Sequence, residues 1–187
     1  MLLSCIAYAV IPVYTLLFVR GSNWFTTNLS VIGSLPSRRT AFFLLGVIIG
    51  LYYYKALKKL LVYLPRHIWE HRLLLTALFL LLLAVTTPYL PDSVPLQALL
   101  HVVFAFVSSV LLALCLYLIL WRLSALTPAA RQILRPFRVS MVAITLVSGL
   151  LLIMAGIISS ALEVFFIIAT TILVQRLYTL SSCIFSR

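Results

Sequence analysis

The sequence predicts an all-α, polytopic membrane protein, a compact bundle of six transmembrane helices with both termini cytoplasmic. Composition is the first reason, because 64% of the 187 residues are hydrophobic and only 9% are charged, whereas a soluble domain is about half apolar and a quarter charged. The second reason is a set of six continuous apolar runs, each near the roughly 20 residues that cross a bilayer as a helix. The runs do not alternate with a period of two residues, which argues against a β-barrel.

The six runs follow one another with little sequence between them. In chain order they lie at about 2–19, 40–64, 73–90, 97–121, 139–158 and 161–181. No repeat, linker or low-complexity tract interrupts them, so residues 1–187 are predicted to form a single integral membrane domain.

The first run, 2–19, is predicted to be a retained helix rather than a secretory signal. No basic residue precedes its apolar segment, and the nearest charge, Arg20, follows it. The second run, 40–64, contains Gly46 and Gly50 in a G-x-x-x-G pattern, which allows close helix packing. Association with a membrane-protein partner or a second copy through these two glycines is a further expectation.

The third run, 73–90, begins after Arg72 and ends in the turn-forming stretch "TPYLPDSVP". The fourth run, 97–121, follows that stretch and carries His101 near its start. Both runs are long enough to cross the bilayer.

The last two runs also border polar residues. Run 139–158 begins after Arg138 and carries small residues such as Gly149 that favour close packing. Run 161–181 contains Glu163 about one turn inside its apolar segment.

The positions of the basic residues predict the orientation. Eleven of the 14 Lys and Arg residues fall on one side of the predicted bundle: Lys55, Lys58, Lys59, Arg66, Arg72, Arg122, Arg131, Arg135, Arg138, Arg176 and Arg187. Because Lys and Arg remain cytoplasmic, both termini are predicted to be cytoplasmic and the protein to lie in the cell membrane. The net charge of +11 then matches anionic lipid headgroups, and no nucleic-acid partner is expected. Aromatic residues near the same helix ends predict an interfacial belt, namely Tyr52, Tyr53, Tyr54, Tyr63, Trp69 and Trp121.

The stretch from His67 to His71, "HIWEH", has the spacing of inverted zinc proteases. A third protein ligand is missing, because Asp92 and Glu163 map to the opposite side of the membrane. We therefore expect an interfacial helix whose His, Glu and Trp side chains reach the headgroups, with no metal and no cofactor. The three cysteines lack paired spacing, so a disulfide is not expected and Cys115 is predicted to be a packing residue; they are Cys5, Cys115 and Cys183.

A polar cluster is predicted on the outer side and is the candidate ligand-binding site. Its members come from the first connection, the third connection and the starts of the fourth and sixth runs: Asn28, Ser30, Arg38, Arg39, Asp92, His101 and Glu163. His101, Ala105 and Ser108 share one helical stripe that is predicted to face the bundle interior.

Glu163 needs a partner, because an unpaired carboxylate inside an apolar segment is costly. The candidates are Arg20, Arg38, Arg39 and His101, either as a structural ion pair or around a ligand or catalytic carboxylate. We expect the stretch 26–39, "TTNLSVIGSLPSRR", to fold back over the outer mouth. Asn28 or Ser30 and one of the paired arginines would then reach His101 or Glu163.

The order "TTNLSVIG", "FLLGVIIG", "LHVVFAF" and "SALEVFFIIATTILVQRLYTL" resembles a bacterial six-helix membrane family known as domain of unknown function 998, itself similar to Frag1/DRAM-type proteins. The resemblance covers most of the chain and matches Asn28 with Ser30, His101 and Glu163 to the family's short motifs. Asn28 stands where the family often has Asp, and Val164 where a basic residue often follows the Glu. Because Frag1-like relatives act in remodelling lipid anchors, the resemblance implies a function connected with lipids.

Three functions remain open from the sequence. The first is binding or moving a lipid headgroup or small amphiphile in an outer-leaflet polar pocket, where arginines would hold phosphate or carboxylate. The second is an intramembrane lipid hydrolase or acyl transferase with His101 as base and Glu163 orienting it. The third is a non-catalytic structural or accessory subunit. A channel is disfavoured, because no predicted helix carries a polar stripe along its full length.

Overall fold

The computed structural model describes residues 1–184, with side chains to Ser181, as an assembly of helices without strands. The elements, in order, are α1 (Leu2–Cys5), η1 (Ile6–Val10), α2 (Ile11–Phe18), α3 (Leu29–Ser34), α4 (Arg39–Leu61), α5 (Ile68–Thr86), α6 (Pro95–Leu126), α7 (Pro128–Ile133), α8 (Arg135–Ala155) and α9 (Ser160–Ile184). The predicted all-α fold is therefore confirmed for this part of the chain. Cys183 and Arg187 lie outside the described side chains.

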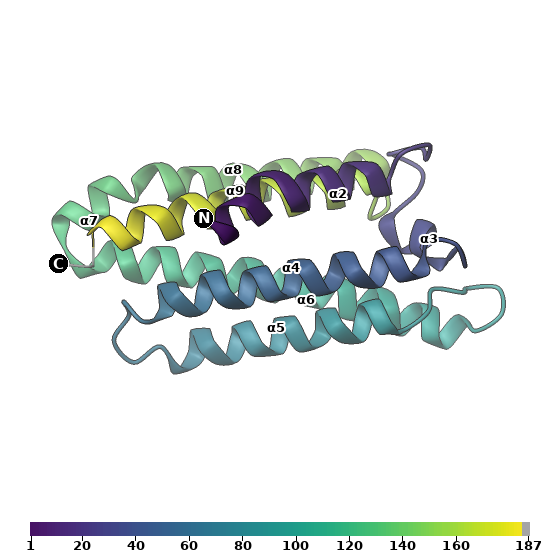
Figure 1. The fold of residues 1–187 in the computed structure, drawn as a ribbon, viewed down its shortest axis with the longest axis horizontal. Helices are drawn as coiled ribbons and strands as arrows, with labels where there is room; N and C mark the ends of the chain where they lie inside the picture. Colours follow the sequence, from purple (N-terminus) through teal and green to yellow (C-terminus); the bar gives the residue numbers. More distant parts are fainter. Residues whose placement is uncertain (185–187) are drawn as a thin grey trace.

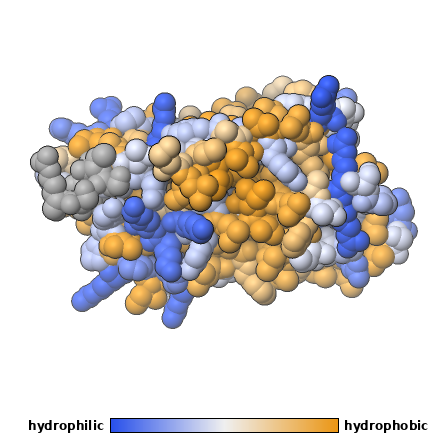
Figure 2. All heavy atoms as spheres, viewed as in Figure 1, coloured by the Kyte–Doolittle hydropathy of each residue, from blue (hydrophilic) through white to orange (hydrophobic). Residues whose placement is uncertain are grey.

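Five described helices are long and apolar enough to cross a membrane: α4, α5, α6, α8 and α9. Between its two polar ends, the surface carries a broad apolar band (Figure 2). The protein is thus a multi-pass membrane protein. The remaining apolar helix, Leu2–Phe18, consists of α1, η1 and α2 in continuous succession and is shorter than the five.

Several helices begin or end outside the predicted runs. The stretch "HIWEH", expected as an interfacial helix, is continuous with the third span, because α5 begins at Ile68 and includes most of it. Similarly, α6 continues to Leu126 and α8 starts at Arg135. Apolar run length marks the hydrocarbon-crossing part of a helix, whereas backbone hydrogen bonding continues into the headgroup region, where polar side chains are tolerated.

The long helices form two groups that share one long direction (Figure 1). Helices α4, α5 and α6 lie on one side, and α2, α8 and α9 on the other, with contacts between α4 and α9 and between α6 and α8. We call the end with α7 and connection 62–67 the basic end. The opposite end, with α3 and connections 87–94 and 156–159, is the α3 end.

Gly46 allows α4 to pack closely against α5 of the same chain. A Cβ atom placed on Gly46 would lie 2.4 Å from Cγ1 of Val85, and one on Gly50 would lie 3.7 Å from Cδ2 of Leu81. The G-x-x-x-G pattern therefore serves an intramolecular contact, and a second copy could use this face only if α5 left it. Association with another chain stays a prediction.

The interfacial role predicted for Tyr52 and Tyr53 is wrong. Both are buried and join α4 to α9 in the interior, where the Tyr52 hydroxyl donates to the carbonyl of Thr171 at 3.1 Å and the Tyr53 hydroxyl lies 2.6 Å from Oγ1 of Thr170. The low polarity of a membrane interior favours such paired polar contacts between helices. Trp69 and Trp121, by contrast, are exposed as the belt requires.

Candidate functional site

The short helix α3 is capped at its N-terminus by Asn28, a residue that the sequence predicted to belong to the ligand-binding site. Asn28 has an extended backbone, and its Oδ1 accepts a hydrogen bond from the backbone N–H of Val31 at 2.7 Å. This is the geometry of a helix N-cap. Gly33 then lets α3 lie directly on α4, because a Cβ there would come within 2.5 Å of the Phe42 ring. Asn28 therefore positions α3 and does not line the cavity described below.

The first connection docks on the start of α9 through contacts in both directions. Backbone N–H groups of Ser160 and Ala161 donate to the carbonyls of Thr27 and Trp24 at 2.6 and 2.9 Å. In return, Oε2 of Glu163 accepts the N–H of Leu29 at 2.6 Å. The first connection thus satisfies free N–H groups at the start of α9, and Glu163 of α9 satisfies a free N–H group at the start of α3. The stretch 26–39 folds back over this end of the bundle, as the sequence predicted.

Ser30 and His101 meet beneath α3. Nδ1 of His101 lies 2.8 Å from the carbonyl oxygen of Thr87, which can only accept, so Nδ1 carries a proton. In the neutral ring Nε2 is then an acceptor, and it lies 2.6 Å from Oγ of Ser30. The serine hydroxyl therefore donates to an imidazole whose tautomer is fixed by the connection between α5 and α6.

A cavity of about 370 Å³ extends from this cluster between α4, α6, α8 and α9. Ser30, His101 and Glu163 line it at the α3 end, whereas most of the remaining wall is apolar. Several wall residues on the facing sides of α6 and α8 are exposed on the surface of the bundle, namely Phe106, Ser109, Val110 and Thr145. The cavity therefore opens sideways through the apolar band, toward the space that lipid chains occupy.

Two polar groups in this region lack partners among the described residues. Oε1 of Glu163 makes no hydrogen bond, and Oγ of Ser148, which also lines the cavity, is buried without one. Buried polar atoms are normally satisfied, so unpaired groups around a cavity are candidates for ligand contacts. His101, Ala105 and Ser108 all line the cavity, which confirms that their helical stripe faces inward.

Three predicted members of the site lie elsewhere. The guanidinium of Arg38 donates to the carbonyl of Phe18 at 2.6 Å, at the carboxyl end of α2, where a cation is favourable. Arg39 and Asp92 are exposed and make no hydrogen bond or ion pair with the described side chains. The predicted pairing of Glu163 with an arginine is therefore wrong, because the backbone N–H of Leu29 takes that place.

At the basic end, Glu70 of "HIWEH" turns into the bundle rather than toward the headgroups. The side chain of Glu70 is buried, and its Oε1 pairs with Nη1 of Arg122 on α6 at 2.5 Å. The same guanidinium donates to the carbonyls of Pro65 and Arg66. Cys115 packs beneath this pair with no exposed surface, which confirms its predicted packing role. The expected headgroup position of Glu70 is wrong, because its carboxylate is buried against the partly exposed guanidinium of Arg122.

Sequence reasoning missed Thr87 and Ser148. Thr87 acts through its carbonyl oxygen, which every residue has, so no side-chain pattern marks it. Ser148 stands in the run of small residues on α8 and was interpreted as a packing position, which is the usual role of such residues.

Comparison of the chain with protein-family models, with curated proteins and with solved structures gives no match. The resemblance to the domain of unknown function 998 family stays a prediction.

Proposed function

We propose that this protein binds a single-tailed or slender amphiphile, with the polar head at Ser30, His101 and Glu163 and the hydrocarbon tail in the cavity. The observation that carries the proposal is the cavity itself, which is polar at one end, apolar along its length, and open toward lipid between α6 and α8. Ligand sites commonly combine an apolar wall with a few convergent polar groups. The resemblance to a lipid-related family points the same way.

The residues that line the cavity also indicate which kind of polar headgroup the amphiphile carries. Among the residues that the structure describes, no Lys or Arg lines the cavity, since Arg38 binds backbone carbonyls and Arg39 is exposed. The available group is Oε1 of Glu163, an acceptor when ionised. A head that donates hydrogen bonds, such as a hydroxyl or an amine, therefore fits better than the phosphate expected from the arginines.

Filling the cavity should abolish binding. We expect Ala105→Trp to lower retention of monooleoylglycerol at least tenfold, because an indole from α6 would occupy the space of the tail. Native mass spectrometry of the protein in neutral detergent, titrated with this lipid, measures the loss. Val103→Trp is the matched control, since Val103 is exposed on the same helix and does not line the cavity. Equal retention by both variants would contradict the proposal and favour a structural subunit.

We further propose that Leu2–Phe18 is a sixth span and that both termini are cytoplasmic in the cell membrane. The support is the gathering of bases at the end formed by α7 and connection 62–67. A cysteine at position 92 should then react with an impermeant maleimide in intact cells, whereas one at position 59 should react only after permeabilisation, in a background without Cys5, Cys115 and Cys183. The reverse pattern would contradict this orientation.

A second candidate function is ester hydrolysis or acyl transfer on the bound amphiphile. The contact between Ser30 and His101 favours it, because a serine hydroxyl that donates to an oriented imidazole is the arrangement of a nucleophile and its base. Oγ of Ser30 would bond to the ester carbonyl carbon while its proton passes to Nε2 of His101. The C–O bond then breaks, the leaving alcohol takes that proton, and water or a second alcohol releases the acyl group from Ser30. The orienting group is the carbonyl of Thr87, in place of the predicted Glu163.

A fluorophosphonate probe tests the second candidate. We expect covalent labelling of Ser30, located by peptide mass spectrometry, and loss of labelling by at least tenfold in His101→Gln, because the base would be removed. Ser109→Ala, which removes another cavity hydroxyl, should label normally. An unlabelled Ser30 in folded, amphiphile-binding protein would leave binding as the function and exclude this reaction.

A further inference from the structure

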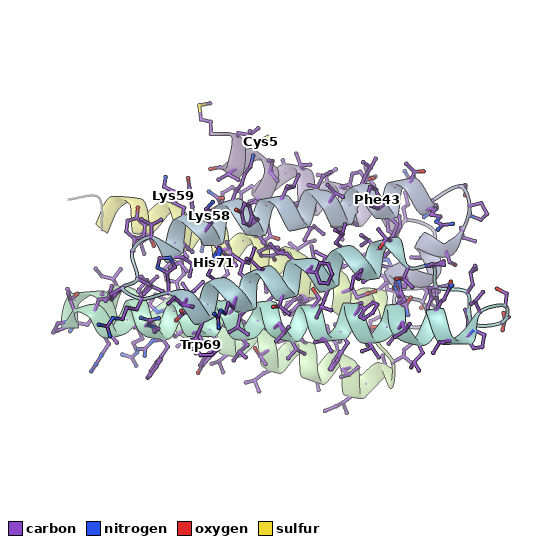
Figure 3. All side chains as sticks on the ribbon, turned by 90° about the horizontal axis from the view of Figure 1, so that it is seen from below. Cys5, Phe43, Lys58, Lys59, Trp69 and His71 are labelled. Carbon is purple, nitrogen blue, oxygen red and sulfur yellow. The ribbon has the colours of Figure 1, made fainter. Side chains whose placement is uncertain are left out.

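A second cavity, of about 270 Å³, lies at the basic end, far along the bundle from the amphiphile site. It is formed where α4 ends and α5 begins. Its lining residues are Lys58, Leu61, Val62, His67, Ile68, His71 and Arg72. Lys58 of α4 and His71 of α5 lie at this end together with Lys59 and Trp69 (Figure 3). The cavity is thus lined by His67, Ile68 and His71 of the "HIWEH" stretch, whereas Glu70 turns into the bundle.

The charged groups around this cavity are cationic and have only neutral partners. Nζ of Lys58 donates to the Tyr54 hydroxyl at 3.1 Å and lies over the ring of the same residue. The guanidinium of Arg72 stacks over Trp69, 5.4 Å from the ring centre. No carboxylate lines the cavity, and the one nearest in sequence, Glu70, is paired with Arg122. A ligand with negative charge would supply the missing counter-ion.

The imidazoles add hydrogen-bonding groups to the same space. Nδ1 of His67 donates to the carbonyl of Leu64 at 2.9 Å, so in the neutral ring Nε2 is an acceptor. His71 stands one helical turn further on the same face and is half-buried. Together with Lys58 and Arg72, His71 offers several N–H donors to a group with several acceptor oxygens, such as a phosphate ester.

The apolar part of the lining distinguishes a lipid from a soluble phosphate. Val62 and Ile68 are 73% and 60% exposed, so large apolar side chains stand directly beside the cations. A membrane lipid places a phosphate and the upper part of its acyl chains side by side in the same way. We propose that this cavity binds the phosphate of an anionic membrane lipid, with its acyl chains against Val62 and Ile68.

The test compares lipid binding by two double variants that lose the same charge, one inside the cavity and one outside it. Native mass spectrometry in neutral detergent would follow binding of phosphatidylglycerol, with phosphatidylcholine as the zwitterionic comparison. We expect Lys58→Gln/Arg72→Gln to weaken phosphatidylglycerol binding at least tenfold, because two cations near a phosphate are removed. The control Lys55→Gln/Arg131→Gln removes equal charge from exposed residues outside the cavity and should change binding less than twofold.

Other outcomes of this experiment would overturn either the defined site or its assignment to a lipid. Equal weakening by both double variants would show diffuse attraction to the basic end and overturn a defined site. Displacement of the lipid by inorganic phosphate at an equal concentration would assign the cavity to a soluble phosphate compound and overturn the lipid assignment. If the first double variant fails to elute as a folded monomeric species, His71→Gln replaces it, with weakened phosphatidylglycerol binding expected and unchanged binding contradicting the proposal. Monooleoylglycerol binding at the α3 end should persist in all these variants, so this test is independent of the first cavity.

Discussion

Arg122→Met is expected to lower the free energy of unfolding by up to about 3–5 kcal/mol, the effect of removing one partner of a fully buried ion pair, because Glu70 is buried although Arg122 is partly exposed. The reason is the position of Glu70, whose side chain is 3% exposed and whose Oε2 already lacks a partner among the described residues. Without the guanidinium, the carboxylate would stay buried and uncompensated, and the carbonyls of Pro65 and Arg66 would lose their donor. Unfolding of the purified protein in mixed micelles, titrated with a denaturing detergent, measures the change.

A double-mutant cycle separates this effect from lost packing. Glu70→Gln/Arg122→Met should be more stable than Arg122→Met alone, since the double variant buries no charge. Arg131→Met on α7 is the control for losing one exposed arginine at the same end and should change the unfolding free energy by less than about 0.5 kcal/mol. An Arg122→Met protein as stable as the Arg131→Met protein would mean that Glu70 reaches water.

Gly46→Ala is expected to destabilise the fold by about 1–3 kcal/mol, the range for overpacking a well-packed contact. The added Cβ would lie 2.4 Å from Cγ1 of Val85 and 3.2 Å from its Cβ. Val85 is β-branched and has one strongly preferred χ1 rotamer in a helix, and its Cβ cannot move away by rotation about χ1. Helices α4 and α5 would have to separate, and a lower thermal midpoint in detergent would report it.

Two companion variants make the Gly46 result specific. Val85→Ala in the Gly46→Ala background should restore most of the lost stability, because the clashing atoms are removed. Gly149→Ala should be neutral or stabilising, by up to about 1 kcal/mol, because an alanine is a better helix former and no atom lies within 4 Å of the new Cβ. Destabilisation by both alanine variants alike would contradict the packing explanation.

The positions of the helices could be predicted because a membrane span requires a long apolar run, and such runs are local in the sequence. The two short helices α3 and α7 were not predicted, because neither is a long apolar run. For α7, the local signal was present, since Thr127 followed by Pro128 is a favourable helix start and the Thr127 side chain accepts the N–H of Ala130. For α3, Asn28 gave a similar signal, but its polarity was interpreted as a ligand contact.

The partners of the polar residues could not be predicted, because they depend on which helices adjoin. Tyr52 was expected near the end of its helix, in the interfacial belt, yet it lies within α4 and is buried by α9, more than a hundred residues later in the chain. Glu163 was expected to meet an arginine, but it accepts a backbone N–H that any residue could supply. Ser30 and His101 were placed at the same end by the charge rule, and only the fold of α3 brings them into contact. The role of these residues in binding stays a prediction.

The reciprocal contacts between the first connection and α9 set an order of events during synthesis. Residues 24–30 leave the ribosome before Ser160, Ala161 and Glu163, which are made more than a hundred residues later. Until α9 has been inserted, Thr27 and Leu29 have no α9 groups to bind and the cavity lacks the wall that α9 provides. The pocket is therefore completed only after α9 has been inserted, so a nascent chain stalled before α9 would expose an unfinished cavity to the surrounding lipid.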